Sequence, residues 1–414
     1  MEEWKEYKLG EISNITKLAG YEFTKYVKYI PDGEIIAIRA LNLRSGHLDL
    51  SDIQKISKEV SDVLERSKLY KNDIVLSYTG TIGACSIISE NDKFHLAPNV
   101  CKITPNSNID PYYLFYIIRS KKFQNQLLGY AHGSTQPTIP MKTIREIPII
   151  ICDYNKQYAI GTILKSLDDK IEVNKRINYN LEQLAQTLYK SWFVDFEPFK
   201  DQPLVESELG MIPKGWRVGV LSEIGEIVGG STPSKAKSEY YTDKGIAWLT
   251  PKDLSISKEK FINRGCQDIT EEGYKSCSTK LMPKGSVLFT SRAPIGYISI
   301  AQKEICTNQG FKSVVPKIAG TGFIYYFLKN ATSEIENKAT GSTFKEASGT
   351  LMKSLPVIIS PKHIFDRFES IISPIHNHQS IIEAEIRRLA EVRDTLLPRL
   401  MSGKLKVNEI EKEL

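Results

Sequence analysis

The segment Ile147-Pro148-Ile149-Ile150 returns about 210 positions later as Leu355-Pro356-Val357-Ile358. Each of these apolar segments is followed by a long stretch with apolar residues every three to four positions. The chain is expected to be built from a duplicated unit.

The repeat extends upstream from this junction. Gly133-Ser134-Thr135 matches Gly341-Ser342-Thr343, and Trp4 matches Trp216. The matched segments keep their order, and the offset between them drifts only between 208 and 213 positions. Accidental similarity among turn residues does not preserve order over a whole chain. We therefore interpret the 414 residues as two copies of one unit.

The long stretch in each copy has the 3.5-residue period of a coiled-coil seam. The seam of the first copy consists of Ile160, Leu164, Leu167, Ile171, Asn174, Asn178, Leu181, Ala185, Leu188 and Trp192. That of the second consists of Phe368, Ile372, Ile375, Gln379, Ile382, Ile386, Leu389, Arg393, Leu396 and Leu400. About 38 residues of helix span ~57 Å, more than the width of a small domain, so we expect the two helices to pack on each other as a strut. An ordinary amphipathic helix lying on its own domain is the alternative, and Pro374 is expected to kink or restart the second helix.

Each copy begins with about 150 residues of short β-branched and aromatic runs separated by turn residues, which predicts a mixed sheet with a few helices. The expected class is α+β, with two similar globular domains and two long helices. The predicted parts are a first globular domain at 1–152, a central long helix at 153–196, a linker at 197–215, a second globular domain at 216–360 and a C-terminal long helix at 361–414.

Composition limits the classes of function. With 41% hydrophobic and 25% charged residues the chain is typical of soluble globular proteins. The formal net charge of +6 permits a polyanionic partner without requiring one. No apolar stretch approaches the ~18 residues that cross a bilayer, so we expect a cytoplasmic protein without a membrane partner. The six cysteines lack the close pairs typical of zinc sites, so no metal site is expected.

Motifs for catalysis are incomplete. No phosphate-binding loop of the Gly-x-x-x-x-Gly-Lys type occurs. The segment 110–113, Asp-Pro-Tyr-Tyr, is similar to the Asp-Pro-Pro-Tyr loop of amino-methyltransferases but lacks the second proline. Asp110 is better interpreted as a helix N-cap with Pro111 in the first helical position. We therefore expect no catalytic site in this chain.

Polar loops recur at matching places in the two copies. Arg, Gln and Asn make bidentate contacts with guanine and adenine edges, whereas Ser and Thr hydroxyls bind phosphate oxygens. The candidate DNA-contacting residues are Arg39, Asn42, Thr79, Thr81, Asn99, Ser134, Thr135, Gln136, Lys252, Ser291, Arg292, Asn308, Gln309, Ser342, Thr343 and Lys345. Base contacts are expected above all from Arg292, Gln136, Arg39, Lys252 and Gln309, and phosphate contacts from Thr79, Ser291, Ser134 and Ser342. For any single loop, a local turn-forming role is the open alternative.

Three segments at the junctions between these parts carry a family resemblance. They are 188–196 (Leu-Tyr-Lys-Ser-Trp-Phe-Val-Asp-Phe), 210–216 (Gly-Met-Ile-Pro-Lys-Gly-Trp) and 396–405 (Leu-Leu-Pro-Arg-Leu-Met-Ser-Gly-Lys-Leu). With them, the chain resembles the specificity subunit of a Type I restriction-modification system over nearly its whole length.

The resemblance implies two target recognition domains separated by two long antiparallel helices, a coiled-coil strut with an internal pseudo-two-fold repeat. Its implied partners are double-stranded DNA, two adenine-methylating modification subunits and an ATP-dependent restriction subunit. S-adenosylmethionine, ATP and magnesium are then expected on those subunits, with no cofactor and no catalysis in this chain. Apolar residues beside the seam, at Ile163, Ile177 and Leu184, are candidates to receive partner helices, with burial inside the strut as the alternative.

Each recognition domain is expected to read one half of a bipartite target while the helices set the unread spacer. The two sets of loops differ in sequence, which predicts an asymmetric target. Two other classes stay open: a duplicated adaptor that binds protein, and a fused methyltransferase or nuclease whose motif the sequence does not reveal.

Overall fold

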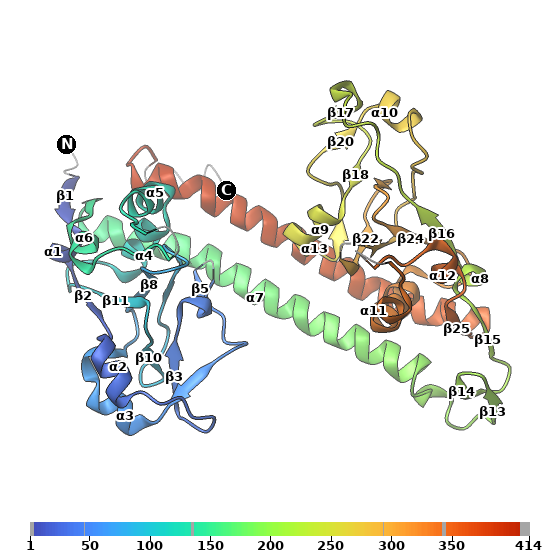
Figure 1. Cartoon of the computed structure of the whole chain (residues 1–414), viewed down its shortest axis with the longest axis horizontal. Helices are drawn as coiled ribbons and strands as arrows, with labels where there is room; N and C mark the ends of the chain where they lie inside the picture. The colour runs from blue at the N-terminus through green and yellow to red at the C-terminus, as the bar shows by residue number, and fades with distance from the viewer. Residues whose placement is uncertain (1–3, 45, 134–135, 293, 342–344, 406–414) are drawn as a thin grey trace. The chain divides into compact units, whose positions relative to one another are not determined.

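A computed structural model of the chain describes residues 4–44, 46–133, 136–292, 294–341 and 345–405 (Figure 1). Its contacts divide the chain into a first unit, residues 1–172 with 388–414, and a second unit, residues 173–387. The long helices are α7 (Tyr154–Phe193) and α13 (Lys362–Met401), and both predicted seams lie on them. Each unit therefore contains one globular part and a portion of both long helices.

The first unit is built on small sheets. Its central antiparallel sheet has the order β2-β11-β8-β9. A second sheet has the order β6-β3-β10-β7, with β3 and β10 parallel. The strands of these two sheets are β2 (Ser13–Lys17), β11 (Val100–Pro105), β8 (Ile74–Ser77), β9 (Cys85–Ile87), β6 (Gln54–Ile56), β3 (Ile35–Ile38), β10 (Phe94–Leu96) and β7 (Lys68–Leu69). Two further pairs are β1 (Lys5–Lys8) with β12 (Pro148–Ile151) and β4 (Leu43–Arg44) with β5 (His47–Leu48).

The second unit repeats this plan. Its main sheet has the order β16-β24-β21-β22-β19. The strands of that sheet are β16 (Gly225–Gly229), β24 (Lys312–Pro316), β21 (Val287–Ser291), β22 (Ile295–Ala301) and β19 (Phe261–Ile262). The smaller pairs are β15 (Arg217–Val220) with β25 (Pro356–Ile359), β18 (Trp248–Leu249) with β23 (Cys306–Thr307), β17 (Tyr241–Thr242) with β20 (Asp268–Ile269), and β13 (Leu204–Ser207) with β14 (Gly210–Pro213). The last pair lies in the segment predicted as a linker.

Shorter helices complete both units. Those of the first are α1 (Leu9–Ile12), α2 (Gly20–Tyr26), α3 (Lys58–Val63), α4 (Pro111–Arg119), α5 (Lys121–Gly129) and α6 (Met141–Glu146), with 3-10 turns η1 (Ala40–Asn42) and η2 (Glu65–Ser67). Those of the second are α8 (Leu221–Ile224), α9 (Pro251–Ser257), α10 (Glu271–Lys275), α11 (Thr321–Lys338) and α12 (Gly349–Lys353), with η3 (Glu197–Phe199) and η4 (Ser238–Tyr240). As predicted, the Asp110 carboxylate caps α4 by accepting from the Tyr113 N–H at 2.8 Å.

Matching backbone hydrogen bonds confirm the duplication. The N–H of Leu9 donates to the carbonyl of Ile147, and the N–H of Leu221 donates to the carbonyl of Leu355, both at 2.9 Å. These bonds tie α1 and α8 to the segments that enter β12 and β25, the strands that precede the long helices. The repeat found by sequence offset is therefore also a repeat of structure.

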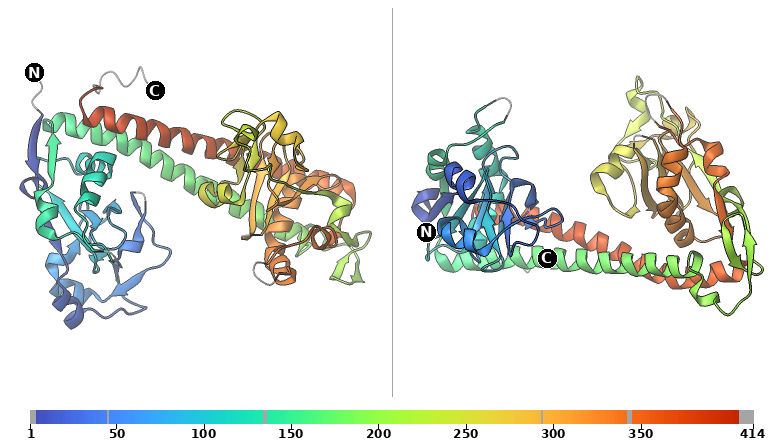
Figure 2. Two further views of the ribbon diagram at one scale, coloured as in Figure 1. Left: turned by 45° about the horizontal axis from the view of Figure 1, so that its top comes forward. Right: turned by 60° about the horizontal axis from the view of Figure 1, so that its bottom comes forward.

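The long helices pair through the predicted seam within each unit. In the first unit, Leu164 of α7 shares a core cluster with Leu396 and Leu400 of α13, and the two helices lie side by side there (Figure 2). In the second unit, the Asn174 amide donates to the Glu385 carboxylate at 2.9 Å, and the Gln379 amide donates to the Asn178 carbonyl at 3.4 Å. Later residues of α7 face earlier residues of α13, so the pairing in that unit is antiparallel.

Pro374 does not restart α13, which was one of the two effects expected from the sequence. The helix is assigned without a break from Lys362 to Met401. Pro374 and Ser370, whose carbonyl loses its helical partner to the proline, are both exposed. Water can therefore satisfy that carbonyl, which explains why the helix continues.

The three junction segments recognised in the sequence contribute residues to the hydrophobic cores next to the ends of the long helices. In the second unit Tyr189, Trp192 and Phe193 pack with Trp216 and Phe368 in one aromatic cluster. The corresponding end of α13 lies in the first unit, where Leu400 and Leu405 are buried and Trp4 packs against their cluster. Gly403 has a φ of +69°, and a Cβ there would come within 2.9 Å of the Trp4 Nε1. Only glycine fits this turn without strain.

Among the described residues, no helix combines the length and apolar character that crossing a bilayer requires.

Candidate nucleic-acid interface

Three loops converge at one end of the main sheet in the first unit. The Tyr78 N–H donates to the carbonyl of Asn99 at 3.1 Å, and the Ile139 N–H donates to the carbonyl of Tyr78 at 3.0 Å. The hydroxyls of Thr79 and Thr138 lie 2.8 Å apart. Loop residues 77–83, 97–99, 131–133 and 136–139, which supply several of the predicted DNA contacts, therefore form one structural site. We call it the first loop junction.

The second unit has a matching site. The Ser291 N–H donates to the carbonyl of Gly310 at 2.7 Å, and the Ala347 N–H donates to the carbonyl of Ser291 at 2.9 Å. The Arg292 guanidinium forms an ion pair with Glu346, with Nη1 and Oε2 3.1 Å apart. Since these bonds match those of the first unit position by position, this second loop junction is its structural counterpart.

The backbone conformation of the two loop junctions explains why glycine and asparagine occur in them. Gly80 and Gly83 in the first unit, and Gly296 in the second, have φ values of +76°, +89° and +97°. Asn99 is also left-handed, with φ +73°, and its side chain is exposed. Left-handed backbone favours glycine and tolerates asparagine, so the glycines serve the turns. Asn99 combines a turn position with an accessible side chain.

Several predicted contacts are exposed at or near the loops. They are Thr81, Asn99, Gln136, Lys252, Gln309 and Lys345. Two of these already have partners: the Gln309 side-chain oxygen accepts from the Thr232 hydroxyl, and the Lys345 ammonium donates to the Glu336 carbonyl at 3.4 Å. Their predicted contacts with DNA stay predictions.

Arg39 and Asn42 organise their own loop. The Asn42 side chain is fully buried, and its amide donates to the carbonyls of Asp49 and Asp52 at 2.9 and 2.7 Å. The Arg39 guanidinium donates to the Asp52 carbonyl at 2.7 Å and pairs with its carboxylate at 3.0 Å. Asn42 therefore has a structural role that the sequence did not reveal. A base contact by its side chain would first require these bonds to break.

Two candidates of the second unit also serve the local structure. The Ser291 hydroxyl is buried and has no hydrogen-bond partner within the described part of the chain. The Asn308 side-chain oxygen accepts from the Gly310 N–H at 2.8 Å and so fixes the turn. A phosphate contact by Ser291 would need its hydroxyl to be uncovered.

Four candidates, Ser134, Thr135, Ser342 and Thr343, lie outside the described residues. Their predicted contacts stay predictions.

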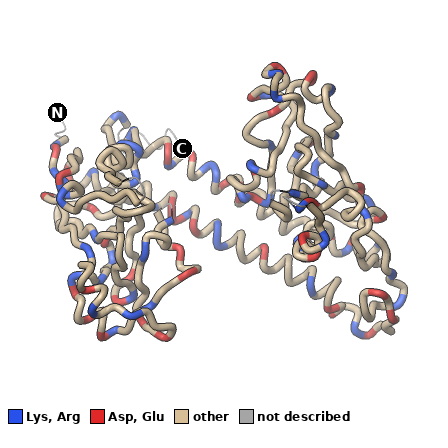
Figure 3. The backbone as a smooth tube through the Cα atoms, viewed as in Figure 1, with Lys and Arg blue, Asp and Glu red and all other residues tan. Residues whose placement is uncertain are grey.

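Sequence reasoning missed three charged residues at the junctions. Lys17 is exposed at the end of β2, with its Nζ 5.5 Å from the centre of the Tyr78 ring. In the second unit, the Lys312 Nζ lies 3.3 Å from Glu346, which also holds Arg292. Glu346 stands 208 positions after Thr138, so the sequence repeat carried the signal that pairs the two positions. Basic and acidic positions are interspersed along both units (Figure 3).

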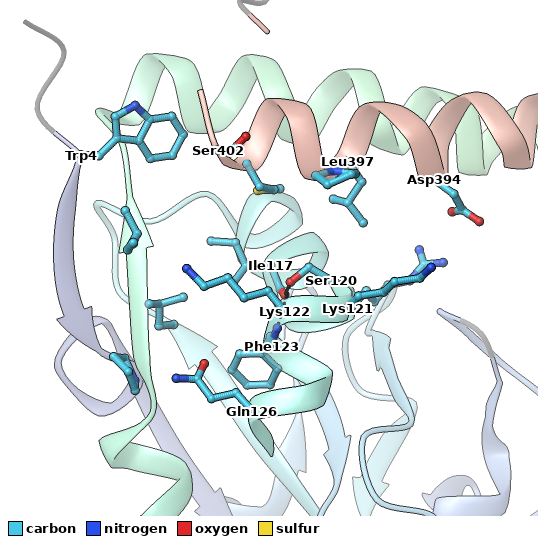
Figure 4. Close-up of a pocket in the computed structure, with 16 residues that line it drawn as sticks. Trp4, Ile117, Ser120, Lys121, Lys122, Phe123, Gln126, Asp394, Leu397 and Ser402 are labelled. Carbon is cyan, nitrogen blue, oxygen red and sulfur yellow. Dashed lines mark hydrogen bonds between the residues drawn. The ribbon is translucent and has the colours of Figure 1, made fainter. Parts of the chain in front are cut away.

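A separate apolar groove of about 790 Å³ lies in the first unit, between α5, β12 and the last turns of α13 (Figure 4). Trp4, Phe123, Leu397 and Met401 supply much of its apolar lining, and Lys121 and Lys122 add positive charge. It shares no lining residue with the first loop junction. Within the ranges that the structure describes, no cluster of three or more His, Cys, Asp or Glu side chains is placed to hold a metal ion.

The family model and the relatives described next belong to one class of protein. The family model described as "Type I restriction modification DNA specificity domain" matches residues 1–183 and 213–391. The HindI specificity subunit of Haemophilus influenzae, a Type I restriction enzyme component, is 27% identical, with 98% of this chain and 100% of that protein aligned. The MjaIX specificity subunit of Methanocaldococcus jannaschii is 43% identical over 155 residues, which are 37% of this chain and 36% of that protein.

The fold is also found in a solved structure. The crystal structure of a Type I restriction-modification S subunit from M. genitalium superimposes with a TM-score of 0.64, covering 96% of each chain at 16% identity. Two matched domains and a shared fold define the class as a tandem DNA specificity protein. This chain belongs to the family of Type I restriction modification DNA specificity domain proteins.

Proposed function

We propose that the chain is the DNA-recognition subunit of a Type I restriction-modification complex, in which each unit reads one half of a bipartite target. The carrying observation is the pair of matching loop junctions, each held by equivalent backbone hydrogen bonds at the end of an equivalent sheet. Hydroxyl, amide and guanidinium groups gathered on loops of a rigid sheet supply phosphate contacts and base contacts together.

The target is asymmetric. The first loop junction presents the neutral pair Thr79 and Thr138, whereas the second presents the charged pair Arg292 and Glu346. Hydroxyls and an Arg–carboxylate pair match different base edges. The two half-sites therefore differ in sequence.

The long helices set the unread spacer. α7 begins among residues of the first unit and ends among residues of the second, and α13 does so in the opposite order. Both are continuous helices whose seams are buried or half-buried. Adding or removing helical turns therefore changes the spacer rather than the half-sites.

Partner subunits carry the chemistry. Two modification subunits bring S-adenosylmethionine for adenine methylation, and a restriction subunit uses ATP and magnesium. On α7 in the second unit, Ile177 and Leu184 are 38% and 49% exposed, an apolar surface that suits a partner helix. Ile163 instead packs against the core of the first unit, so it does not contribute to that surface.

The test combines the chain with its modification subunits and maps methylated adenines on random-sequence DNA. The expected result is methylation at one asymmetric bipartite sequence, dependent on this chain. A palindromic or contiguous target, or methyl transfer by this chain alone, contradicts the proposal. Binding that does not weaken with rising salt favours the protein-binding adaptor instead, because phosphate contacts make affinity fall steeply with ionic strength.

A further inference from the structure

The two loop junctions differ at one equivalent pair of positions. Thr138 forms a backbone bridge with His132, and Glu346 forms the same bridge with Thr340. The partner across the junction is Thr79 in the first unit and Arg292 in the second. A pair of hydroxyls 2.8 Å apart in one unit thus occupies the place of an ion pair in the other.

Glu346 holds two cations at once. Its Oε2 lies 3.1 Å from the Arg292 Nη1, and its Oε1 lies 3.3 Å from the Lys312 Nζ. The side chains of Glu346 and Arg292 are 36% and 37% exposed, whereas that of Lys312 is 18% exposed. Arg292 and Glu346 are therefore accessible to a ligand, while Lys312 fixes the carboxylate from the protein side.

The carboxylate limits what this site can bind. A phosphate that approaches Arg292 meets the negative charge of Glu346 beside it, so a backbone contact is disfavoured. A ligand that satisfies both groups must offer acceptors to the guanidinium and a donor to the carboxylate. In the major groove a G·C base pair does this best, because guanine presents two adjacent acceptors, O6 and N7, to one guanidinium and cytosine presents its N4 amino group as a donor, whereas adenine presents N7 alone beside its own amino group.

We propose that Glu346 is a specificity-determining residue, which reads one G·C pair of the second half-site together with Arg292. The inference rests on the proposed function and names the base pair for this site. Arg292 donates to guanine, and Glu346 accepts from cytosine. Lys312 is the positioning residue that keeps Glu346 in place when Arg292 turns to DNA. On DNA that lacks this base pair, Arg292 and Glu346 remain paired with each other, so Glu346 suppresses non-specific binding.

The first loop junction supplies the matched control. Thr79 and Thr138 carry no charge, so removing one hydroxyl there leaves the electrostatics of binding unchanged. Glu346→Gln removes the negative charge with little change in shape, and Thr138→Val is the equivalent isosteric change in the first unit.

The experiment measures binding of the complex with its modification subunits to three kinds of duplex, over a series of salt concentrations. The duplexes are the methylation target, targets with one base pair replaced, and unrelated DNA. Glu346→Gln is expected to raise affinity for unrelated DNA by about three- to tenfold and to steepen the salt dependence by up to ~1 in log-log slope, since freed cations now contact phosphate. Discrimination at one G·C pair should fall by about tenfold. Thr138→Val should leave the salt dependence unchanged.

Arg292→Ala locates the base pair. It should relax discrimination at the same G·C pair as Glu346→Gln, and relaxation at different pairs overturns the inference. Unchanged affinity, salt dependence and discrimination in Glu346→Gln also overturn it, provided that thermal unfolding shows the variant to be folded. A wild-type complex without any sequence preference contradicts the proposed function instead, so the two failures are distinguishable.

Discussion

The two units attach their globular parts to the long helices with different charged groups. In the first unit, the Asp168 carboxylate of α7 accepts from the Tyr116 hydroxyl at 2.7 Å and from the guanidinium groups of Arg119 and Arg393, each at 2.6 Å. Tyr116 and Arg119 come from α4, and Arg393 comes from α13. One carboxylate therefore joins the globular part to both helices.

In the second unit, Glu182 of α7 has this role. It accepts from the Tyr326 hydroxyl at 3.1 Å and from the ammonium groups of Lys260 and Lys329 at 2.7 and 2.6 Å. The Gln379 amide of α13 donates to it at 3.3 Å. Here lysines supply the positive charge that arginines supply in the first unit. Lys260 is deeply buried, since its side chain is only 7% exposed.

In this attachment, the groups on the globular parts match between the two repeats, whereas the groups on the long helices do not. Tyr116 and Arg119 match Tyr326 and Lys329 at an offset of 210, so the globular side kept its hydroxyl and its cation. The carboxylates at 168 and 182 do not match. Helix α7 thus meets the equivalent pair of groups with a carboxylate at a different position in each unit, because a buried cation needs a carboxylate within reach.

Glu182→Leu should have the largest effect. It leaves Lys260 buried without its carboxylate, and breaking a buried pair in this way costs about 3 to 5 kcal/mol. Denaturant unfolding followed by tryptophan fluorescence measures the loss, since Trp192, Trp216 and Trp248 all lie in the second unit. Adding Lys260→Met should recover part of it. A double variant as unstable as the sum of the single variants contradicts a direct pairing.

Asp168→Leu should destabilise the first unit by a smaller amount, about 2 to 3 kcal/mol, because Asp168 is 24% exposed and water can partly solvate its arginines. Hydrogen exchange measures the effect locally. Faster exchange is expected in α4 of the first unit, with α11 of the second as the internal control. Equal acceleration in both helices contradicts the assignment of Asp168 to the first unit alone.

In the alkaline range, the free energy of unfolding should depend on pH differently in the two units. Burial lowers the pKa of Lys260 to about 8, although Glu182 opposes the shift. Between pH 8 and the unfolded value of 10.5, the unfolded chain binds more protons at this residue, so stability of the second unit rises with pH by at most ~1.4 kcal/mol per pH unit. In the first unit, the hydrogen bond and charge of Asp168 outweigh burial and raise the pKa of Arg393 above its usual value, so this cation keeps its charge over the same range.

The measurement compares wild type with Lys260→Met by fluorescence-detected unfolding from pH 7 to 9.5. Wild-type stability should rise relative to that of the variant over this range. Parallel curves contradict a lowered pKa for Lys260.

Exchanging the cations should have the smallest effect. Lys329→Arg should change the free energy of unfolding by less than ~0.5 kcal/mol, since Lys329 is 36% exposed. Arg119→Lys should cost somewhat more, about 1 kcal/mol, because the guanidinium also packs over the rings of Phe115 and Tyr116. Equal effects of the two exchanges, measured by unfolding, contradict the greater dependence of the first unit on arginine.

Much of the fold was predictable because it depends on periodic patterns. The seams from Ile160 to Trp192 and from Phe368 to Leu400 lie on α7 and α13, and the cap at Asp110 forms as expected. The candidate site was predictable only at the level of loops. Asn42 and Arg39 resemble base-reading residues in the sequence, but folding places Asp49 and Asp52 beside them. A side chain's partners from other loops are not encoded in its local pattern.

The amino-acid sequence alone determined that the chain is a duplicated α+β protein with two long helices, because offset and heptad spacing are properties of the linear chain. Only the tertiary structure decided which groups meet: Glu346 with Arg292 and Lys312, and Glu182 with Lys260. Those contacts join residues 34 to 78 positions apart. Their formation depends on how strands and helices pack in three dimensions, since no local propensity brings such distant charges together.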